Sequence, residues 1–463
     1  MKKLLPFAVL IVFINHYCFS QIALNKASDA VDIGLQNAEE YKIEKLQALT
    51  GIKLSKFNLG EFLPSFTFSI TESDGKKYNA SDTRTKSIQF GIVQTIFNGG
   101  KTKLSYDMSK LSSSFQYSQY EQDLRIFSVK IIQFYFDYVT QLKNIEAKKD
   151  LISNAEEQLN ISKAEFERGL LLASDYMEYE ISVLKMKNQL KQMERGLKTS
   201  LRSFKVLLGL PLETELIINN REELNEEEDF FLEPYTDFIV TIVQNSNIEL
   251  QQQRLSMEYN KKQLTLSKRF YIPSISLEGN VSYSGENYPL TEPNYSVKLG
   301  VSFSDLPFVP FNFSEGYGFD NKGFNNISNS VNGSIKPDFT YNLSSRNSDL
   351  TLQKKLLDYK TKEQSLKETV LSKIAAHDDY LDNIKIIKET LSLQEKRLAV
   401  CKAEVDKGEK KRLDYLNDLE EHAEQIIELS ATQNNLISSW YELELLTNIP
   451  LGELRNVCLS SKY

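Results

Sequence analysis

The sequence predicts a mainly α-helical protein with a β-barrel portion, built as a tandem repeat of long coiled-coil helical hairpins with four β-strands per chain. Two observations support the repeat and its helices. Landmarks of the first half return in the second half at one constant offset of 239 residues, and long runs without glycine or proline carry a seven-residue apolar period. A third observation predicts the strands, because short segments of alternating apolar residues precede each long run. The fold is therefore two copies of one long supersecondary unit.

The repeat is clearest at two glycines. Gly169 is followed six residues later by an Asp-Tyr pair at 175–176, and Gly408 is followed by the same pair at 414–415. Each copy then continues as a helix-like segment to a Leu/Ile-Pro-Leu stop, at residues 210–212 and 449–451.

The long runs predict two unusually long helices. Residues 101–168 and 338–407 contain neither glycine nor proline, and at 1.5 Å rise per residue each helix would be about 100 Å long. Apolar residues recur every seven positions in the first run, which predicts helices packed with a left-handed supercoil. These positions are Tyr117, Leu124, Ile131, Tyr138, Ile145, Ile152, Leu159 and Phe166.

Shorter helices are expected on both sides of each long one, and stacking each short pair end to end along its long partner gives a slender hairpin. Gly169 and Gly408 then lie at the turns where the long helices reverse, since glycine readily ends a helix. The short segments are about 27–60 and 170–208 in the first copy, and 236–270 and 409–448 in the second.

Alternating segments predict one β-hairpin per copy, with strands at about 63–71 and 87–97, and at about 272–284 and 294–304. Their length and single apolar face fit transmembrane strands as well as strands of a soluble sheet. Four strands cannot close a barrel, and open edges are not tolerated in lipid. Membrane strands would therefore have to be pooled among chains, and three chains would supply twelve. The second copy also carries an insert at about 305–337, rich in Phe, Asn and Gly.

The domain organisation follows from these boundaries. Residues 1–20 have the charge, apolar stretch and small cleavage-site residue of a signal peptide, the rival interpretation being a lipoprotein acylated at Cys18. Residues 21–212 form the first repeat, 213–235 an acidic connector containing the run Glu226–Asp229, and 236–463 the second repeat.

Composition excludes several classes of function. The net charge is −8 and the pI about 5.4, so no basic face is available for nucleic acid. His377 lies on the apolar seam and His422 on a short helix, and no metal-binding spacing, phosphate loop or nucleophile with a base is present. We expect no enzyme, no cofactor and no metal, with Cys401 and Cys458 as unpaired thiols.

In the order and spacing of these features the chain resembles the TolC family of outer-membrane efflux and secretion channels. The resemblance rests on Leu63-Pro64 and Ile272-Pro273 before the strands, the sequence FNGG at 97–100, the Gly-x5-Asp turns, and the closing segments 209–211 and 448–450. It implies a homotrimer, with a twelve-stranded barrel among outer-membrane lipids and a periplasmic α-helical tunnel that narrows at the turns.

The resemblance also implies a function and partners. The chain would be the passive exit duct of a tripartite efflux or type I secretion system, joined to a periplasmic adaptor (a membrane fusion protein) and an inner-membrane pump, and conducting small molecules or proteins. The alternative is a periplasmic or surface coiled-coil scaffold or adhesin without a pore.

Site residues are implied by the same resemblance. Asp414 matches the first acidic residue of the channel aperture, whereas the second position is Asn417, with Asp418 next to it. Asp175 is the counterpart of Asp414 in the first copy. Lys410 matches the basic latch residue, although the family's tyrosine partner is Val405 here. Gly169, Leu170 and Gly408 match the adaptor-docking turns, with Glu409 replacing the apolar residue in the second copy.

Plainer interpretations of these charges stay open. Asp175 and Asp414 could cap the helices that follow them, since acidic groups satisfy free N–H groups and the helix dipole there. The basic residues 410–412 could pair with Asp175 or Glu178 across the turns, or form a solvated cluster.

Overall fold

A computed structural model describes residues 22–57, 60, 62–76, 78, 83–218, 230–268, 271–304, 306–335 and 341–460. The predicted signal peptide, with Cys18, lies outside the described residues, as does the centre of the acidic connector with its charge run at Glu226–Asp229. The chain divides into two compact units. Unit 1 contains residues up to Tyr41, Asp123–Thr236 and Leu371–Tyr463, and unit 2 contains Lys42–Gln122 and Asp237–Val370.

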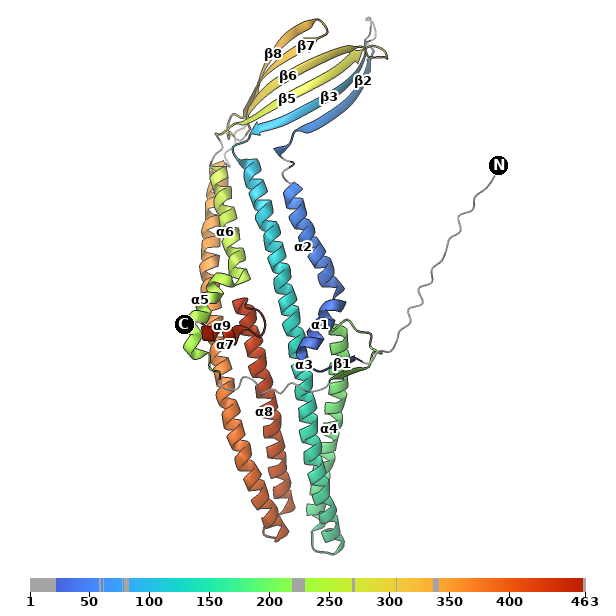
Figure 1. The fold of residues 1–463 in the computed structure, drawn as a ribbon, viewed down its shortest axis with the longest axis vertical. Coiled ribbons are helices and arrows are strands. Elements are labelled where there is room, and N and C mark those ends of the chain that lie inside the picture. Colours follow the sequence, from blue (N-terminus) through green and yellow to red (C-terminus); the bar gives the residue numbers. More distant parts are fainter. Residues whose placement is uncertain are drawn as a thin grey trace, which may run out of the picture. The chain divides into compact units, whose positions relative to one another are not determined.

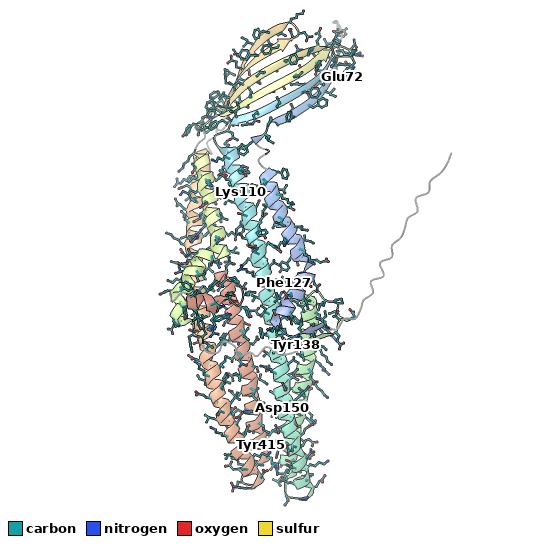
Figure 2. All side chains as sticks on the ribbon, in the orientation of Figure 1. Glu72, Lys110, Phe127, Tyr138, Asp150 and Tyr415 are labelled. Atoms are coloured by element: carbon teal, nitrogen blue, oxygen red, sulfur yellow. The ribbon has the colours of Figure 1, made fainter. Side chains whose placement is uncertain are left out.

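Unit 2 contains a six-stranded sheet in the order β2-β3-β5-β6-β7-β8, with every neighbouring pair antiparallel (Figure 1). The contact between β3 and β5 joins the hairpins of the two repeats into one sheet. Glu72 lies at the end of the first hairpin that is farthest from the helices of this unit (Figure 2). The strands are β2 (Ser65–Gly75), β3 (Thr83–Phe97), β5 (Ser274–Gly285), β6 (Glu292–Phe303), β7 (Phe311–Asp320) and β8 (Gly323–Gly333).

The predicted class, mainly α with a β portion, is confirmed, but the predicted number of four strands is wrong. The insert at about 305–337 forms a third hairpin, β7 and β8, which continues the sheet from β6. The alternation in β8 is sparse, because Ile327 and Val331 are separated by a run of serines and asparagines. Such a strand gives a weak periodic signal, and its pairing with β7 is what makes it recognisable.

Four helices or helix parts belong mainly to unit 2: α2 (Glu39–Phe57), α6 (Ile248–Ser267) and the first parts of α3 (Lys101–Glu167) and α7 (Tyr341–Asp406). The Ser113 hydroxyl of α3 donates a hydrogen bond of 3.1 Å to the carbonyl of Gly51 in α2. In the second repeat, Arg254 of α6 donates one of 3.0 Å to the hydroxyl of Tyr359 in α7. The short helix α5 (Thr236–Ser246) precedes α6.

None of the described helices has a stretch both long and apolar enough to cross a membrane.

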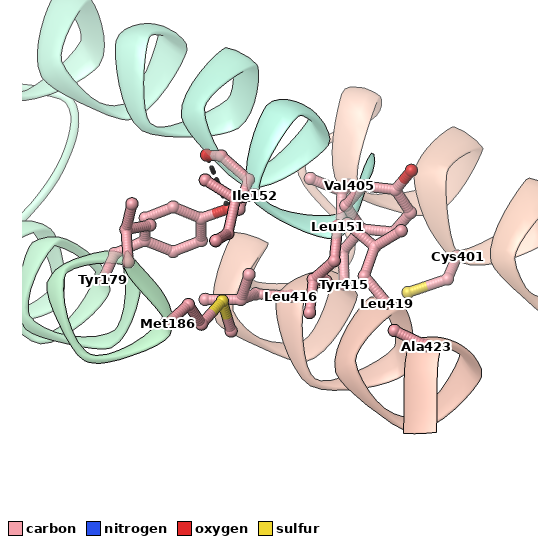
Figure 3. Packing of buried hydrophobic residues seen from close by; sticks show 12 residues of the cluster. Leu151, Ile152, Tyr179, Met186, Cys401, Val405, Tyr415, Leu416, Leu419 and Ala423 are labelled. Atoms are coloured by element: carbon pink, nitrogen blue, oxygen red, sulfur yellow. Dashed lines mark hydrogen bonds between the residues drawn. The ribbon is translucent and has the colours of Figure 1, made fainter. Parts of the chain in front are cut away.

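Unit 1 is built on two helical hairpins, α3 with α4 (Ala173–Leu207) and α7 with α8 (Arg412–Thr447). Near the turns, side chains from all four helices form one buried cluster (Figure 3). The Tyr179 hydroxyl within it donates a hydrogen bond of 3.3 Å to the carbonyl of Ala155, so the buried phenol keeps a partner. The cluster contains Leu151, Ile152, Ala155, Tyr179, Val183, Met186, Cys401, Val405, Tyr415, Leu416, Leu419 and Ala423.

The other end of unit 1 has a second core around a small parallel sheet of β1 (Ile22–Leu24) and β4 (Leu216–Ile218). Tyr135 of α3 and Phe204 of α4 are fully buried there, against α1 (Ala27–Asn37). The two short helices end alike, since Gly209 and Asn448 occupy equivalent repeat positions and both have positive φ, 65° and 59°.

A buried carboxylate fixes the end of the second repeat. Glu444 of α8 is fully buried and accepts hydrogen bonds from the backbone N–H groups of Gly452 (2.8 Å) and Leu454 (3.1 Å), the first residue of α9 (Leu454–Ser460). Asn448 lies between Glu444 and Gly452 in the sequence, and its carbonyl accepts a hydrogen bond of 2.8 Å from Arg125 of α3. These polar contacts hold the chain after α8 against the hairpins of unit 1.

We expect Glu444→Ala to lower the free energy of unfolding by about 3 kcal/mol, because the buried N–H group of Leu454 and the N–H group of Gly452 would both lose their acceptor. Denaturant unfolding of the purified protein, followed by far-ultraviolet circular dichroism, measures this loss. Glu442→Ala is the matched control. That side chain is 37% exposed and pairs with Lys373, so its removal should change stability by less than about 1 kcal/mol. Equal effects of the two substitutions would contradict this account.

Candidate functional site

The two helical turns of unit 1 share one backbone geometry. Gly169 and Gly408 have φ of 75° and 77°, a region that residues with a side chain rarely adopt. The N–H of Leu170 donates to the carbonyl of Glu165, and the N–H of Glu409 donates to that of Glu404, both at 2.9 Å. These bonds satisfy the last carbonyls of α3 and α7. The turns therefore repeat in structure as they do in sequence.

An arginine joins the two turns. Arg412, the first residue of α8, lies against the last turns of α3 with its side chain only 14% exposed. Its Nε and Nη2 donate to the two carboxylate oxygens of Glu165 at 3.0 and 2.6 Å, and its Nη1 donates to Gln158 at 2.7 Å. This bidentate geometry is the strongest form of ion pair between side chains. The Arg412 hydrogen bond holds the pKa of the Glu165 carboxyl below its ordinary value.

Both partners occupy the less favourable end of a helix. A positive charge at the start of α8 and a negative charge at the end of α3 each oppose the helix dipole. Each charge is instead compensated by the other. From the sequence we expected Arg412 to pair with Asp175 or Glu178 or to belong to a solvated basic cluster, and neither Glu165 nor Gln158 was among its expected partners. Two adverse charges at helix ends were the signal that could have found this pair.

The neighbouring lysines make weaker contacts. Lys411 Nζ lies 3.8 Å from Asp175 Oδ2 across the turns, with the lysine side chain 73% exposed. Lys410, the predicted latch residue, bonds Glu404 of its own hairpin at 2.7 Å, and this hydrogen bond raises the pKa of Lys410. Glu404 and Glu165 occupy equivalent positions in the two repeats. Both are contacted by basic residues of the second turn, Glu404 by Lys410 and Glu165 by Arg412.

The predicted aperture residues take different positions at the start of α8. Asp414 and Asn417 are exposed and lie three residues apart, on one face of the helix. Asp418 turns toward α7, where it forms an ion pair with Arg397. Asp175 is half-buried beside Lys411. The residues at the N-cap of α4 and α8, Leu172 and Lys411, make no side-chain cap hydrogen bond.

The predicted docking residues lie at the surface of the first turn. Gly169 and Leu170 are exposed, and Leu172 beside them is 70% exposed. Gly408 is also exposed in the second turn, where the next residues are Glu409 and Lys410. One turn thus presents leucines and the other presents charges. Between the turns lies a cavity of about 380 Å³.

Two cysteines and one histidine are buried within unit 1. Burial raises the pKa of the Cys401 and Cys458 thiols to about 11, and neither cysteine forms a disulfide. His377 is fully buried between Trp440 and Asp378, with its Nδ1 3.0 Å from Asp378 Oδ1, and burial lowers its pKa. Among the described residues no group of three or more His, Cys, Asp or Glu side chains is arranged to hold a metal ion.

The chain is similar to a family of outer-membrane proteins in sequence and to several solved channel structures in fold. Residues 60–210 match the family model described as outer membrane efflux protein. One similar solved structure is that of CusC, a protein that forms a transmembrane channel. Its sequence is 12% identical, the alignment covers 92% of each chain, and the TM-score is 0.73. The Campylobacter jejuni outer membrane channel CmeC has 14% identity over 94% of this chain and 89% of its own, with a TM-score of 0.70.

The outer membrane protein VceC of Vibrio cholerae has 10% identity, covers 91% of this chain and 94% of its own, and gives a TM-score of 0.72. No curated protein matches the chain by sequence. The predicted resemblance to the TolC family is confirmed by the family model and by these structures. At such identities, the structures establish the fold.

We expect the Arg412–Glu165 pair to contribute a coupling free energy of about 1.5 kcal/mol, because a bidentate, largely buried ion pair exceeds a surface one. A double-mutant cycle of Arg412→Ala and Glu165→Ala, measured by denaturant unfolding, gives this value. The pair Lys411–Asp175 is the matched control, with an expected coupling below about 0.5 kcal/mol.

The coupling should also depend on pH. The folded pKa of Glu165 lies below 4.5, so the contribution is complete above pH 4.5 and is lost as the pH falls through the lowered value. Equal couplings for the two pairs, or a coupling that survives protonation of Glu165, would contradict this assignment.

Proposed function

We propose that this chain, which has the fold of outer-membrane channels and a first repeat matching the outer membrane efflux proteins, is an outer-membrane exit duct. The observation that carries the proposal is the sheet of unit 2. Most paired residues on one face are apolar and many are exposed, as in the row Phe68, Phe90, Val281 and Tyr295. The charged exceptions on this face are Glu72 and Asp74 of β2, Arg84 and Lys86 of β3, and Glu315 of β7. The opposite face is lined mostly by serine, threonine, asparagine and glycine. Strands with an apolar and a polar face are typical of a membrane sheet around a water-filled lumen.

The duct would serve a tripartite efflux or type I secretion system as a homotrimer. A periplasmic adaptor and an inner-membrane pump would be its partners, and outer-membrane lipid would surround the sheet. Small molecules or proteins would pass without chemistry. Exposed Leu170, beside Gly169, supports an apolar docking contact at the first turn, whereas the turn at Gly408 would dock through charges.

The turns of unit 1 supply the proposed gate. Asp414, with Asn417 on the same helix face, would line the aperture, where three copies bring three carboxylates together and favour cations. Asp175 and Asp418 would lie behind them, each beside a basic residue, Lys411 and Arg397 respectively. The Arg412–Glu165 pair would hold the two turns closed, with Lys410 bracing the second turn through Glu404. Opening would separate the turns as discrete elements.

The alternative function, a periplasmic or surface coiled-coil scaffold or adhesin, has no need of the exposed apolar face of the sheet. We expect the chain to remain in the outer-membrane fraction after an alkaline wash, as an oligomer, because that face would be buried in lipid. Membrane fractionation followed by cross-linking of the washed membranes measures this. A chain released as a monomer would favour the scaffold.

We expect Arg412→Ala to raise the resting conductance in planar bilayers about tenfold, because losing about 1.5 kcal/mol shifts a closed–open equilibrium by that factor. Lys411→Ala is the matched control, with a change below about twofold. In the unmodified protein the resting conductance should also rise as the pH falls below 4.5 through the lowered pKa of Glu165. A variant at Arg412 that stays as closed as the control would remove this pair from the gate.

A further inference from the structure

The third hairpin continues both faces of the sheet. Val331 of β8 lies opposite Phe313 of β7, which lies opposite Val301 of β6, so apolar pairs continue from β6 into the insert. One row on this face is polar, because Glu315 of β7 lies opposite Asn329 of β8, and the Glu315 carboxylate accepts a hydrogen bond of 2.6 Å from the hydroxyl of Tyr317. On the other face Ser330 lies opposite Ser314, and their hydroxyls are 2.6 Å apart. Apart from the row of Glu315 and Asn329, the insert has an apolar face and a polar face, like the four strands that precede it. Such a pattern is expected of a strand that separates lipid from water.

Glycines on the polar face extend the curvature of the sheet into the insert. A Cβ added at Gly300 of β6 would lie 2.9 Å from the hydroxyl of Ser276, and one at Gly316 of β7 would lie 2.7 Å from that of Ser328. Side chains thus crowd on this face, and glycine makes room for them, as expected on the concave side of a curved sheet. The curved strands are visible in Figure 1. The third hairpin is shaped to the same curve.

The pairing of β7 with β6 is extensive. It runs in register from Tyr295 opposite Phe319 to Phe303 opposite Phe311, where the two phenylalanine rings stack with centroids 4.7 Å apart. The edge of β6 is therefore occupied by β7. The two open edges of the sheet are β2 and β8, whose residues are almost all exposed, in contrast to the half-buried inner strands.

These open edges lack the features that prevent edge-to-edge pairing. Gly323–Gly333 contains no charged residue and no proline, and the first seven residues of β2, 65–71, contain none either. Soluble sheets protect their edges with lysine, proline, bulges or a covering helix. Because all six strands alternate in direction, β8 of one copy would run antiparallel to β2 of the next. An even number of strands lets this alternation continue around a closed sheet.

We propose that β8 is the edge that docks β2 of a second copy of this chain, and that three copies pool eighteen strands in place of twelve. The inference rests on the proposed duct function and specifies which edge strands join neighbouring copies in the barrel. The diameter of a barrel grows roughly linearly with strand number, so this one would be about one and a half times as wide as a twelve-stranded one. The rival arrangement folds the third hairpin away and pairs β6 with β2.

Cysteine cross-linking in intact outer membranes distinguishes pairing of β8 with β2 of the next copy from pairing of β6 with that strand. Thr67→Cys on the polar face of β2 is combined with a cysteine on the same face of β8, at Asn326, Ser328 or Ser330. The matched controls combine it with β6, at Asn294, Ser296 or Lys298. Within one chain β2 and β8 are separated by four strands, about 24 Å at ordinary strand spacing, so these disulfides can form only between copies. Cys401 and Cys458 are buried, and single-cysteine variants check that they do not react.

We expect the β8 pairs to yield covalent dimers and trimers of the chain, and the β6 pairs to yield none. Cross-links through β6 would overturn the proposal in favour of twelve strands. A chain that stays in the washed membrane as an oligomer, but cross-links through neither strand, would overturn it as well and leave the duct function standing. Release of the unmodified chain from the membrane as a monomer would contradict both the duct function and the eighteen-stranded barrel. Each cysteine variant is first tested for retention, so that a misfolded variant is replaced by its neighbour in the scan.

Discussion

The need to satisfy backbone hydrogen bonds at the strand edges constrains everything else in this protein. A six-stranded sheet with one mainly apolar face has two open edges, and neither residues 65–71 of β2 nor residues 323–333 of β8 include a charged residue or a proline. In hydrocarbon each unpaired N–H or C=O costs several kcal/mol, so such edges have to be paired. In the proposed duct the sheet would therefore complete its hydrogen bonding only with other copies, and the functional unit would be an assembly of chains.

Duplication explains the framework of the helices, and divergence explains the site. The turns at Gly169 and Gly408 have nearly the same backbone angles and the same closing hydrogen bonds. Their side chains differ, since one turn presents leucines and the other presents lysines and Arg412. The ion pair between the turns needs this asymmetry, because two identical turns would place like charges together.

The two cores of unit 1 set the positions of these charges. The cluster beneath the turns draws side chains from all four helices (Figure 3), so a close-packed interior fixes the relative positions of α3 and α8. Arg412 and Tyr415 lie one turn apart on α8, and burial of the tyrosine places the arginine against Glu165. The gate proposed here depends on that packing as much as on its charges.

The sequence by itself determined the helical hairpins, their turns and the first four strands. These features depend on local signals: the seven-residue period through Ile131 and Ile145, positive φ at glycine, and strict alternation such as that of Phe66, Phe68 and Ile70. Only the tertiary structure decided that residues 311–333 join the sheet and that Arg412 binds Glu165. A sparse strand is defined by its neighbour, and an ion pair between residues 247 positions apart is defined by helix packing. Such distant contacts leave no period in the sequence.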